Sequence, residues 1–508
     1  MINTPKTSRR EFLAWGAALA TSAAGCGETE NKSSVAMTTP LTDLSATDAI
    51  AAMHDGNISA ESYATALLDR CESGAHLNAF ISFEPERVLE AARAADTKRA
   101  AGGDLATLHG LPIPVKDSVN TKDYRTTGGT TALSRFTPAE DAELVTRLKN
   151  AGAIVMGKTN IHELSFGWTS NNQAFGSVKN PYDITRIPGG SSGGTAAAIA
   201  YRMAPIGIAE DTQGSIRVPA ALCGVYGFRP TQNRYPNTGV VPITPLFDQV
   251  GPHTRNVADL VLFDHVMSGE AIVDTPAPLQ GIRLGIPREY FYGMLDTEVE
   301  SITNEALRKL VDAGVVLVEV DVPDLQRLIS LTTAQIQSYH AKPMLTKYLE
   351  EFDTGISFDE LMAQVSPDIE TAFALYVLGG AQTPTEEDFV AARDEHLPAL
   401  RKTLDDYYRA NDLAAMIFPA TQIVAPPIGH DLETTLNGKT VPFEPVISRN
   451  ISPGSTSGTP GIIVPADLNS EGLPVSLELD APAGSDRTLL GIGLAIEAVL
   501  GHIPPPGL

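Results

Sequence analysis

Short apolar segments alternate with helical segments along most of the chain, and this alternation limits the fold more than any other feature. Strands are predicted at residues 111–115, 153–156, 205–209, 282–286, 315–320 and 474–479. Helices are predicted at 45–54, 60–72, 84–101, 139–150, 196–200, 298–313 and 487–500. Because such an alternation buries short strands beneath the helices that connect them, we expect an α/β protein. Its central, mixed and twisted sheet should be covered by helices on both faces.

The chain from residue 38 to residue 508 is predicted to be a single domain. It contains no change in composition large enough to mark a linker, and it has no internal repeat. Apolar residues make up 43% of the whole chain, which is enough for a large core. Residues from about 323 to 410 have a mostly helical pattern, and we interpret them as an insertion or cap within this domain.

The first 37 residues are interpreted as a targeting segment with a tether. Residues 8–13, Ser-Arg-Arg-Glu-Phe-Leu, resemble a twin-arginine export signal, and an apolar stretch follows. That stretch has about 14 residues, fewer than the roughly 20 needed to span a bilayer. The sequence before Cys26 is similar to a lipoprotein processing site, except that Ala23 stands where Leu is usual. We expect an exported protein, either periplasmic after cleavage near Ala24 or anchored in the membrane by a lipid on Cys26.

The overall charge and the cysteine content exclude several classes of partner. The formal net charge is -24, and a surface this acidic repels the phosphate backbone of nucleic acid. The three cysteines, Cys26, Cys71 and Cys223, are too few for a disulfide framework and are not spaced as metal ligands. We therefore expect no nucleic-acid partner, no metal and no other cofactor.

Residues 152–159, Gly-Ala-Ile-Val-Met-Gly-Lys-Thr, match the pattern of a phosphate-binding loop. Such a loop follows a strand and precedes a helix, whereas here the inner residues are themselves apolar and a helix comes before them. Backbone N–H groups of a buried strand bond to neighbouring strands and cannot hold phosphates. We therefore predict a buried strand here.

Residues 189–193, Gly-Gly-Ser-Ser-Gly, match the Gly-x-Ser-x-Gly pattern of α/β-hydrolases. In that fold the serine, here Ser191, would lie on a tight turn between a strand and a helix. The preceding residues 180–188 have the composition of a loop. An esterase that uses Ser191 in this way is kept as an alternative, as is an exported binding lipoprotein without catalytic activity.

A longer pattern resembles the amidase signature family over about residues 42–500. Residues 188–194 read Pro-Gly-Gly-Ser-Ser-Gly-Gly, and residues 211–219 read Asp-Thr-Gln-Gly-Ser-Ile-Arg-Val-Pro. The likeness also includes the upstream segments 110–117 and 151–160. Downstream it includes 227–231, 459–461 and 472–475. A match this long and in this order is specific, and it implies an enzyme that cleaves a small-molecule carboxamide.

The resemblance implies a catalytic triad. The family's nucleophile corresponds to Ser215, and its base corresponds to Lys116. The family's relay serine follows a cis peptide bond and corresponds to Ser191. A serine hydroxyl needs a base before it can attack an amide, and no histidine of this chain lies in a motif. Lysine can serve instead where burial lowers the pKa of its amine. Attack by Ser215 would give an acyl-enzyme, which water then hydrolyses.

The resemblance also assigns the donors that stabilise the oxyanion. These are the backbone N–H groups of Thr212, Gln213, Gly214 and Ser215. Gln213 stands where the family usually has Gly, which leaves the local geometry open. The pair Ala-Glu210 replaces two residues that are usually small.

Further residues are given supporting roles. Asp211 and Arg217 are expected to form a structural pair beside the nucleophile, and Ser192 to support the relay. The substrate pocket is expected to include Gly167, Trp168 and Thr169, with Trp168 stacking on an aromatic acyl group or packing in the core.

The segments 437–450 and 489–493 resemble the branch of mandelamide and indoleacetamide hydrolases. That branch implies small arylalkyl amides as substrates, while anilides, urethanes and peptide C-terminal amides stay open. A tRNA amidotransferase subunit is a rival within the family, against which the export signal and the acidic charge both argue. A homodimer is among the assemblies left open.

Overall fold

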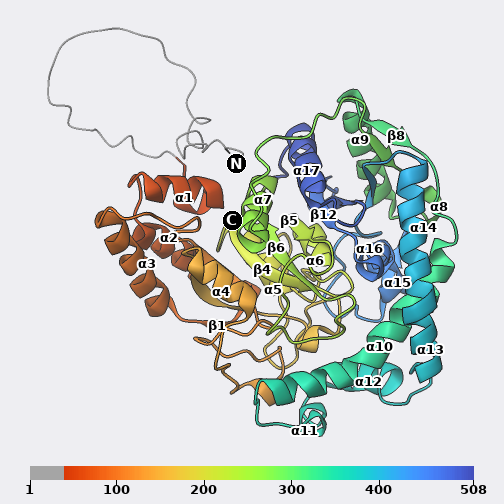
Figure 1. The fold of residues 1–508 in the computed structure, drawn as a ribbon, viewed down its shortest axis with the longest axis horizontal. Coiled ribbons are helices and arrows are strands. Elements are labelled where there is room, and N and C mark those ends of the chain that lie inside the picture. Colours follow the sequence, from red (N-terminus) through yellow and green to blue (C-terminus); the bar gives the residue numbers. More distant parts are fainter. Residues whose placement is uncertain (1–38, 508) are drawn as a thin grey trace, which may run out of the picture. The chain divides into compact units, whose positions relative to one another are not determined.

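A sheet of eleven strands runs through residues 39–507, the part of the chain described by this computed structural model (Figure 1). In order across the sheet the strands are β1 (Phe80–Phe83), β3 (Ile154–Thr159), β2 (Pro112–Lys116), β4 (Ile206–Asp211), β6 (Gln249–Thr254), β5 (Tyr226–Arg229), β12 (Gly461–Leu468), β13 (Pro474–Asp480), β9 (Ala415–Pro419), β7 (Arg283–Gly285) and β8 (Val316–Val318). β2 pairs in parallel with β3 and β4, whereas β4 and β6 are antiparallel. The sheet is therefore mixed, as predicted. β10 (Glu433–Leu436) and β11 (Lys439–Pro442) form a separate hairpin.

Helices flank this sheet, which confirms the α/β class predicted from the alternation (Figure 1). They are α1 (Ala46–His54), α2 (Ala60–Ser73), α3 (Pro85–Ala100), α4 (Glu143–Asn150), α5 (Gly193–Ala200), α6 (Arg217–Leu222), α7 (Val257–Ser268), α8 (Arg288–Phe291), α9 (Thr297–Asp312), α10 (Leu325–Glu351), α11 (Phe358–Met362), α12 (Pro367–Tyr376), α13 (Glu386–Ala391), α14 (Leu397–Ala410), α15 (Phe443–Ser448), α16 (Ser452–Ser457) and α17 (Asp486–Leu500). α5 and α6 pack against each other, and α7 packs against α17.

Helix α5 consists almost entirely of small residues, and this brings it close to the sheet. A Cβ atom added to Gly194 would lie 2.4 Å from the carbonyl oxygen of Asn160 and 2.6 Å from that of Ala79. Only glycine fits at so close an approach of two backbones. The residues just before the helix, Ser191 and Ser192, are thereby held next to the carboxyl ends of β2 and β3.

Several predicted elements have different limits in the structure, and two of them bear on the analysis of the site. The helix expected at 139–150 begins only at Glu143, because the N–H of Ala142 donates to the carbonyl oxygen of Asn120. The strand expected at 153–156 continues to Thr159 as β3 and includes Lys158. The Gly-Lys-Thr segment is therefore part of a buried strand, which confirms that it is not a phosphate-binding loop.

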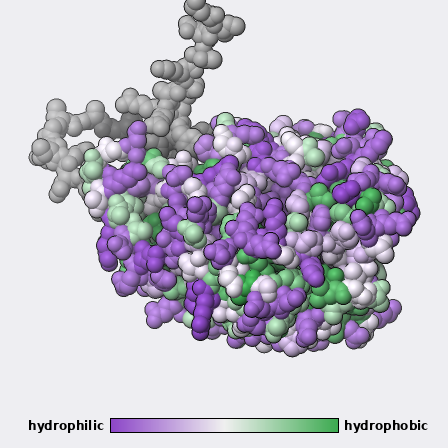
Figure 2. All heavy atoms as spheres, turned by 60° about the horizontal axis from the view of Figure 1, so that its bottom comes forward, coloured by the Kyte–Doolittle hydropathy of each residue, from purple (hydrophilic) through white to green (hydrophobic). Residues whose placement is uncertain are grey.

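Helices α10 to α14 follow one another between Leu325 and Ala410. Leu345 and Tyr348 of α10 and Phe373 of α12 form an apolar cluster with Leu164 and Val241, which belong to loops beside the sheet. The side of the molecule with α11 and α12 shows apolar patches within a mostly hydrophilic surface (Figure 2). This segment therefore packs onto the loops at one edge of the sheet.

The predicted export signal, the tether and Cys26 lie outside the described residues. In the range 39–507 no helix has both the length and the apolar character needed to cross a membrane.

Candidate active site

Lys116 is the last residue of β2, and its side chain is fully buried. Its Nζ atom donates hydrogen bonds to Ser191 Oγ at 2.6 Å and to Glu210 Oε1 at 2.7 Å. Burial lowers the pKa of the Lys116 amine, and the negative charge of Glu210 partly opposes this effect. The buried amine thus faces one hydroxyl and one carboxylate.

Ser191 is fixed by its backbone as well as by Lys116. The peptide bond between Gly190 and Ser191 is cis, as the family resemblance led us to expect. The carbonyl oxygen of Ser191 accepts hydrogen bonds from the backbone N–H of His162 at 3.1 Å and from Ser170 Oγ at 3.2 Å. The next residue, Ser192, donates to the carbonyl oxygen of Glu210 at 3.1 Å and so ties the same loop to β4.

Ser215 lies in the turn between β4 and α6, and it lines a cavity of about 320 Å³. The carboxylate of Asp211 shapes this turn, because it accepts hydrogen bonds from the N–H of Gly214 at 2.8 Å and of Ile216 at 3.1 Å. Within the described part of the chain the Ser215 hydroxyl has no hydrogen-bond partner. It is therefore available to a molecule in the cavity.

One of the expected oxyanion donors is not available. The N–H of Gly214 already donates to Asp211 Oδ1 at 2.8 Å, so in this structure it is engaged within the turn. The backbone N–H groups of Thr212, Gln213 and Ser215 have no acceptor among residues 39–507, and all three residues line the cavity. These three N–H groups are free to bind an anionic oxygen there.

Gln213 links the oxyanion turn to two helices. Its Nε2 donates to Thr456 Oγ1 at 3.3 Å in α16, and that hydroxyl lies 2.8 Å from Thr333 Oγ1 in α10. Its Oε1 accepts from Ser452 Oγ at 3.1 Å, and its carbonyl oxygen accepts from Trp168 Nε1 at 2.8 Å. The side chain that replaces the usual Gly therefore anchors the turn to α16.

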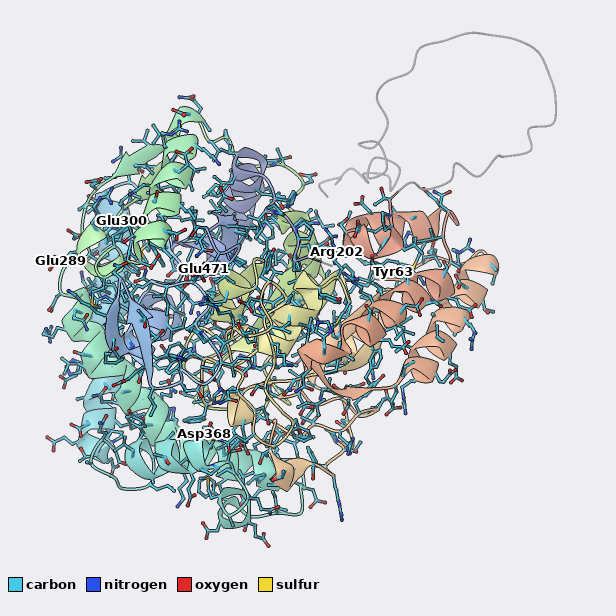
Figure 3. All side chains as sticks on the ribbon, turned by 180° about the vertical axis from the view of Figure 1, so that it is seen from behind. Tyr63, Arg202, Glu289, Glu300, Asp368 and Glu471 are labelled. Atoms are coloured by element: carbon cyan, nitrogen blue, oxygen red, sulfur yellow. The ribbon has the colours of Figure 1, made fainter. Side chains whose placement is uncertain are left out.

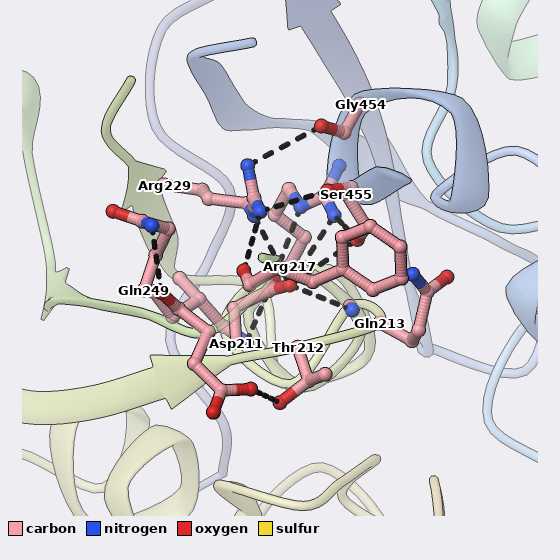
Figure 4. Close-up of polar contacts among 12 residues, drawn as sticks. Asp211, Thr212, Gln213, Arg217, Arg229, Gln249, Gly454 and Ser455 are labelled. Carbon is pink, nitrogen blue, oxygen red and sulfur yellow. Dashed lines mark hydrogen bonds and ion pairs between the residues drawn. The ribbon is translucent and has the colours of Figure 1, made fainter. Parts of the chain in front are cut away.

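A cluster of buried charges lies behind the Ser215 turn (Figure 4). Arg217 Nε is 3.1 Å from Asp211 Oδ2, which is the structural pair expected from the sequence, and Arg229 Nε is 3.3 Å from Asp211 Oδ1. Arg217 also contacts Glu478 and Ser455. Although burial alone would raise the pKa of Asp211, the two guanidinium groups hold it below its ordinary value. The cluster therefore keeps Asp211 ionised as an acceptor for the turn.

The cavity is bounded by several elements that are far apart in the sequence. Its lining residues come from the loop before Ser191, the oxyanion turn, and helices α10, α12 and α15: Phe166, Gly167, Trp168, Thr212, Gln213, Ser215, Ile243, Ile329, Thr333, Ala334, Ala372, Tyr376 and Glu444 among them. The predicted pocket residues Gly167 and Trp168 are thus part of the wall.

Thr169, the third predicted pocket residue, contacts a histidine instead. Its Oγ1 lies 3.3 Å from His162 Nδ1. His162 Nε2 in turn lies 3.8 Å from Asp368 Oδ2 at the start of α12, where Figure 3 labels Asp368. Thr169 therefore fixes the loop that carries Trp168, and it is not among the residues that line the cavity.

Glu210 is the site residue whose position the sequence did not predict. The sequence marks it only as a departure from the small residues usual in the family. In the structure its Oε1 atom accepts hydrogen bonds from Lys116 Nζ at 2.7 Å and from Ser165 Oγ at 2.5 Å. The unusual residue type could have indicated a contact with a lysine or arginine, because a carboxylate inside a core needs a cationic partner.

The α/β-hydrolase alternative for Ser191 is wrong. The residues that precede it form a loop with no strand, and its hydroxyl is bonded to a lysine. A nucleophile elbow requires a strand directly before the serine and a histidine as its base.

Comparison with known proteins gives consistent matches over nearly the whole domain. The profile of the family described as Amidase matches residues 63–490. The indoleacetamide hydrolase of Agrobacterium vitis is 38% identical over 85% of this chain and 92% of that protein. The mandelamide hydrolase of Pseudomonas putida is 37% identical over 92% of this chain and 93% of that protein. The native peptide amidase of Stenotrophomonas maltophilia superposes with a TM-score of 0.76 at 28% identity, over 92% of this chain and 99% of that one.

Replacing Arg217 tests the role of the charge cluster. Arg217→Met leaves the carboxylates of Asp211 and Glu478 buried without this partner, and we expect a loss of about 3–5 kcal/mol in the free energy of unfolding, measured in urea. Arg308→Met is the control, since Arg308 forms only exposed ion pairs with Glu305 and Asp312 and should leave the unfolding midpoint unchanged. Equal midpoints for the two variants would contradict a structural role of the cluster.

Proposed function

The chain belongs to the amidase signature family, whose members hydrolyse amides, and from this premise we propose that it cleaves a small carboxamide through Ser215, Ser191 and Lys116. The observation that carries the proposal is the 2.6 Å hydrogen bond between the buried Lys116 amine and Ser191 Oγ. Ser215, in the turn between β4 and α6, lines the cavity.

In the proposed reaction the proton moves through the two serines. Ser215 Oγ attacks the carbonyl carbon while its proton passes to Ser191 Oγ and that of Ser191 passes to Lys116 Nζ. The same relay in reverse protonates the leaving nitrogen, so that the C–N bond breaks and an ester on Ser215 is left. Water activated by the relay then attacks the ester, which releases the carboxylate and restores the serine.

The negative oxygen of the tetrahedral intermediate needs donors that are already in place. We assign this role to the free N–H groups of Thr212, Gln213 and Ser215, because each has no other acceptor in the described chain and each residue lines the cavity. Donors fixed in this way require no rearrangement as the charge develops. The ties from Gln213 to α16 support this rigidity.

The cavity favours an aromatic acyl group. Phe166, Trp168, Ile243 and Ile329 supply apolar and aromatic wall, and a volume of about 320 Å³ suits a molecule with one or two rings. The relatives named above act on indoleacetamide and mandelamide, which are primary amides with an arylalkyl acyl group. We propose arylalkyl carboxamides as the substrates and ammonia as the second product.

Export is proposed on the sequence of the first 26 residues alone. The Ser-Arg-Arg-Glu-Phe-Leu segment and the short apolar stretch after it favour a twin-arginine signal, and Cys26 offers an attachment point for a lipid. A periplasmic location, free or lipid-anchored, would place the enzyme where exogenous amides arrive.

Replacing the proposed nucleophile and base tests the chemistry. We expect Ser215→Ala and Lys116→Ala each to lower kcat/KM for ammonia release from phenylacetamide and indole-3-acetamide by about three orders of magnitude or more, since residues that act as a unit fail when any one is removed. Ser476→Ala is the control, because Ser476 is a buried serine of β13 bonded to the carbonyl of Ala221. Ammonia release that persists in Ser215→Ala would refute the assignment of the nucleophile.

Replacing Trp168 tests the proposed acyl pocket. Trp168→Ala should lower kcat/KM for phenylacetamide relative to propionamide by roughly tenfold or more, the range for lost contacts in an apolar pocket. Trp168→Phe keeps an aromatic wall but loses the hydrogen bond to Gln213, so it separates stacking from support of the turn. An equal loss with both amides in Trp168→Ala would contradict a role in substrate choice.

Replacing the arginine pair tests export. In a bacterium with twin-arginine transport, the double change Arg9→Lys and Arg10→Lys should move the protein from the periplasmic or membrane fraction to the cytoplasm. The mass of the mature N-terminus distinguishes a lipid on Cys26 from cleavage near Ala24. A wild-type protein that stays in the cytoplasm at full length would contradict the proposal.

A further inference from the structure

Glu210 lies at the centre of the buried polar groups beside the proposed triad. It is the next to last residue of β4, and its side chain is 4% exposed, next to Lys116 at 0%. Its Oε1 atom accepts both from Lys116 Nζ and from Ser165 Oγ. Ser165 itself lines the cavity, so a short chain of hydrogen bonds joins the cavity wall to the amine.

The hydrogen bond between Lys116 Nζ and Glu210 affects how the amine can act as a base, because the neutral amine has few hydrogens. A neutral amine has two N–H bonds and one lone pair, and only the lone pair can take a proton. As an ammonium, Lys116 donates one N–H to Ser191 Oγ at 2.6 Å and another to Glu210 Oε1 at 2.7 Å. When the amine is neutral and keeps an N–H on Glu210, rotation about the Cε–Nζ bond is restricted, and the lone pair can face Ser191 Oγ in place of the lost N–H. Without that anchor, an N–H could face Ser191 equally well, and the amine could not act as a base in that orientation.

We propose that Glu210 is a positioning residue of the reaction: it holds the Lys116 amine with its lone pair toward Ser191, and it stabilises the ammonium that forms when the proton arrives. This inference rests on the proposed function of Lys116 and Ser191. Glu210 gains no proton at any step, since the proton taken from Ser215 resides on Lys116 and returns to the leaving nitrogen. The acid behind the histidine in Ser-His-Asp triads plays the equivalent part.

Other charged groups face the same amine and have to be separated from Glu210. Asp211 on β4 and Asp248 just before β6 act on Lys116 in the same direction as Glu210. The buried rings of His162 and of His253 on β6 are also close enough to interact with Lys116, and burial lowers the pKa of His253 to about 4. Burial and the neighbouring Glu210 raise the pKa of Asp248 to about 7, so Asp248 could produce a step in the pH profile of its own.

The pH dependence of kcat/KM distinguishes positioning from simple packing. Activity rises with pH as Lys116 loses its proton, so the midpoint of the rising limb follows the pKa of the amine. Glu210 raises that pKa, and hence Glu210→Gln should move the limb to lower pH by about 1–3 units, the usual effect of one adjacent charge. The plateau should fall by roughly tenfold to a hundredfold, because the amine becomes a weaker and less well-oriented base.

Four further measurements make the test specific. Glu210→Asp keeps the charge and should leave the limb within about one unit of the wild type, while its plateau falls. Asp248→Asn should move the limb less than Glu210→Gln does. Asp264→Asn is the control, since Asp264 is a buried carboxylate paired with Arg234 at 2.7 Å and does not line the cavity. Thermal unfolding of each variant identifies any that does not fold.

The outcomes separate this inference from the proposed function. A folded Glu210→Gln enzyme whose limb stays in place, or a limb that moves only in Asp248→Asn, would overturn the role of Glu210 while Ser215→Ala still abolished activity. If Glu210→Gln fails to fold, Glu210→Asp decides: an unchanged limb with a lowered plateau supports the inference, whereas an unchanged plateau, or a downward shift of the limb by about 1–3 units, refutes it. Activity that survives Lys116→Ala would refute the relay itself.

Discussion

The site depends on keeping one amine out of water. Lys116 is the last residue of a buried parallel strand, where an isolated ammonium would be strongly unfavourable, and its two hydrogen-bond partners, Ser191 and Glu210, are what make the burial tolerable. The same burial lowers the pKa of the amine and gives a lysine a use as a base. A surface lysine, fully solvated, would stay protonated at neutral pH and could not accept a proton from a serine.

Strand β4 carries a contact of this amine, Glu210, and leads directly into the turn of Ser215. Successive residues of a strand point to opposite faces of the sheet, so Glu210 and Asp211 project in opposite directions. Glu210 meets Lys116, whereas Asp211 meets Arg217 and Arg229 and accepts the N–H groups that shape the turn of Ser215. Two adjacent carboxylates thus belong to two different ion clusters, one around Lys116 and one that holds the turn of Ser215. A shift of β4 by one residue would place Glu210 and Asp211 on the opposite faces of the sheet.

The sequence predicted many of the apolar strands and helices of the fold, although not the apolar strands β9 and β12. Other strands were missed for physical reasons. β5 and β6 escaped prediction because Tyr226–Arg229 and Gln249–Thr254 carry Gly, Pro, Arg or His at positions that only tertiary pairing makes buried. The arrangement of Lys116 beside Ser191 came from the family resemblance, since contacts across 75 residues leave no local pattern. The hydrogen bond from the Gly214 N–H to Asp211 depends on the direction of the Asp211 carboxylate, and sequence spacing does not determine this direction.

The proposed catalytic residues and the helical wall of the cavity come from different parts of the chain. The amine, the serines and the oxyanion turn come from strands and loops of the central sheet, whereas Ile329 and Thr333 of α10 and Tyr376 of α12 belong to the helical segment and form the opposite wall of the cavity. Gln213 joins the two parts, because its amide reaches Thr456 and, through that hydroxyl, Thr333. A change in the helical wall can therefore reach the oxyanion turn through three side chains. A glycine at position 213 would not provide this hydrogen-bonded path between the helical wall and the turn of Ser215.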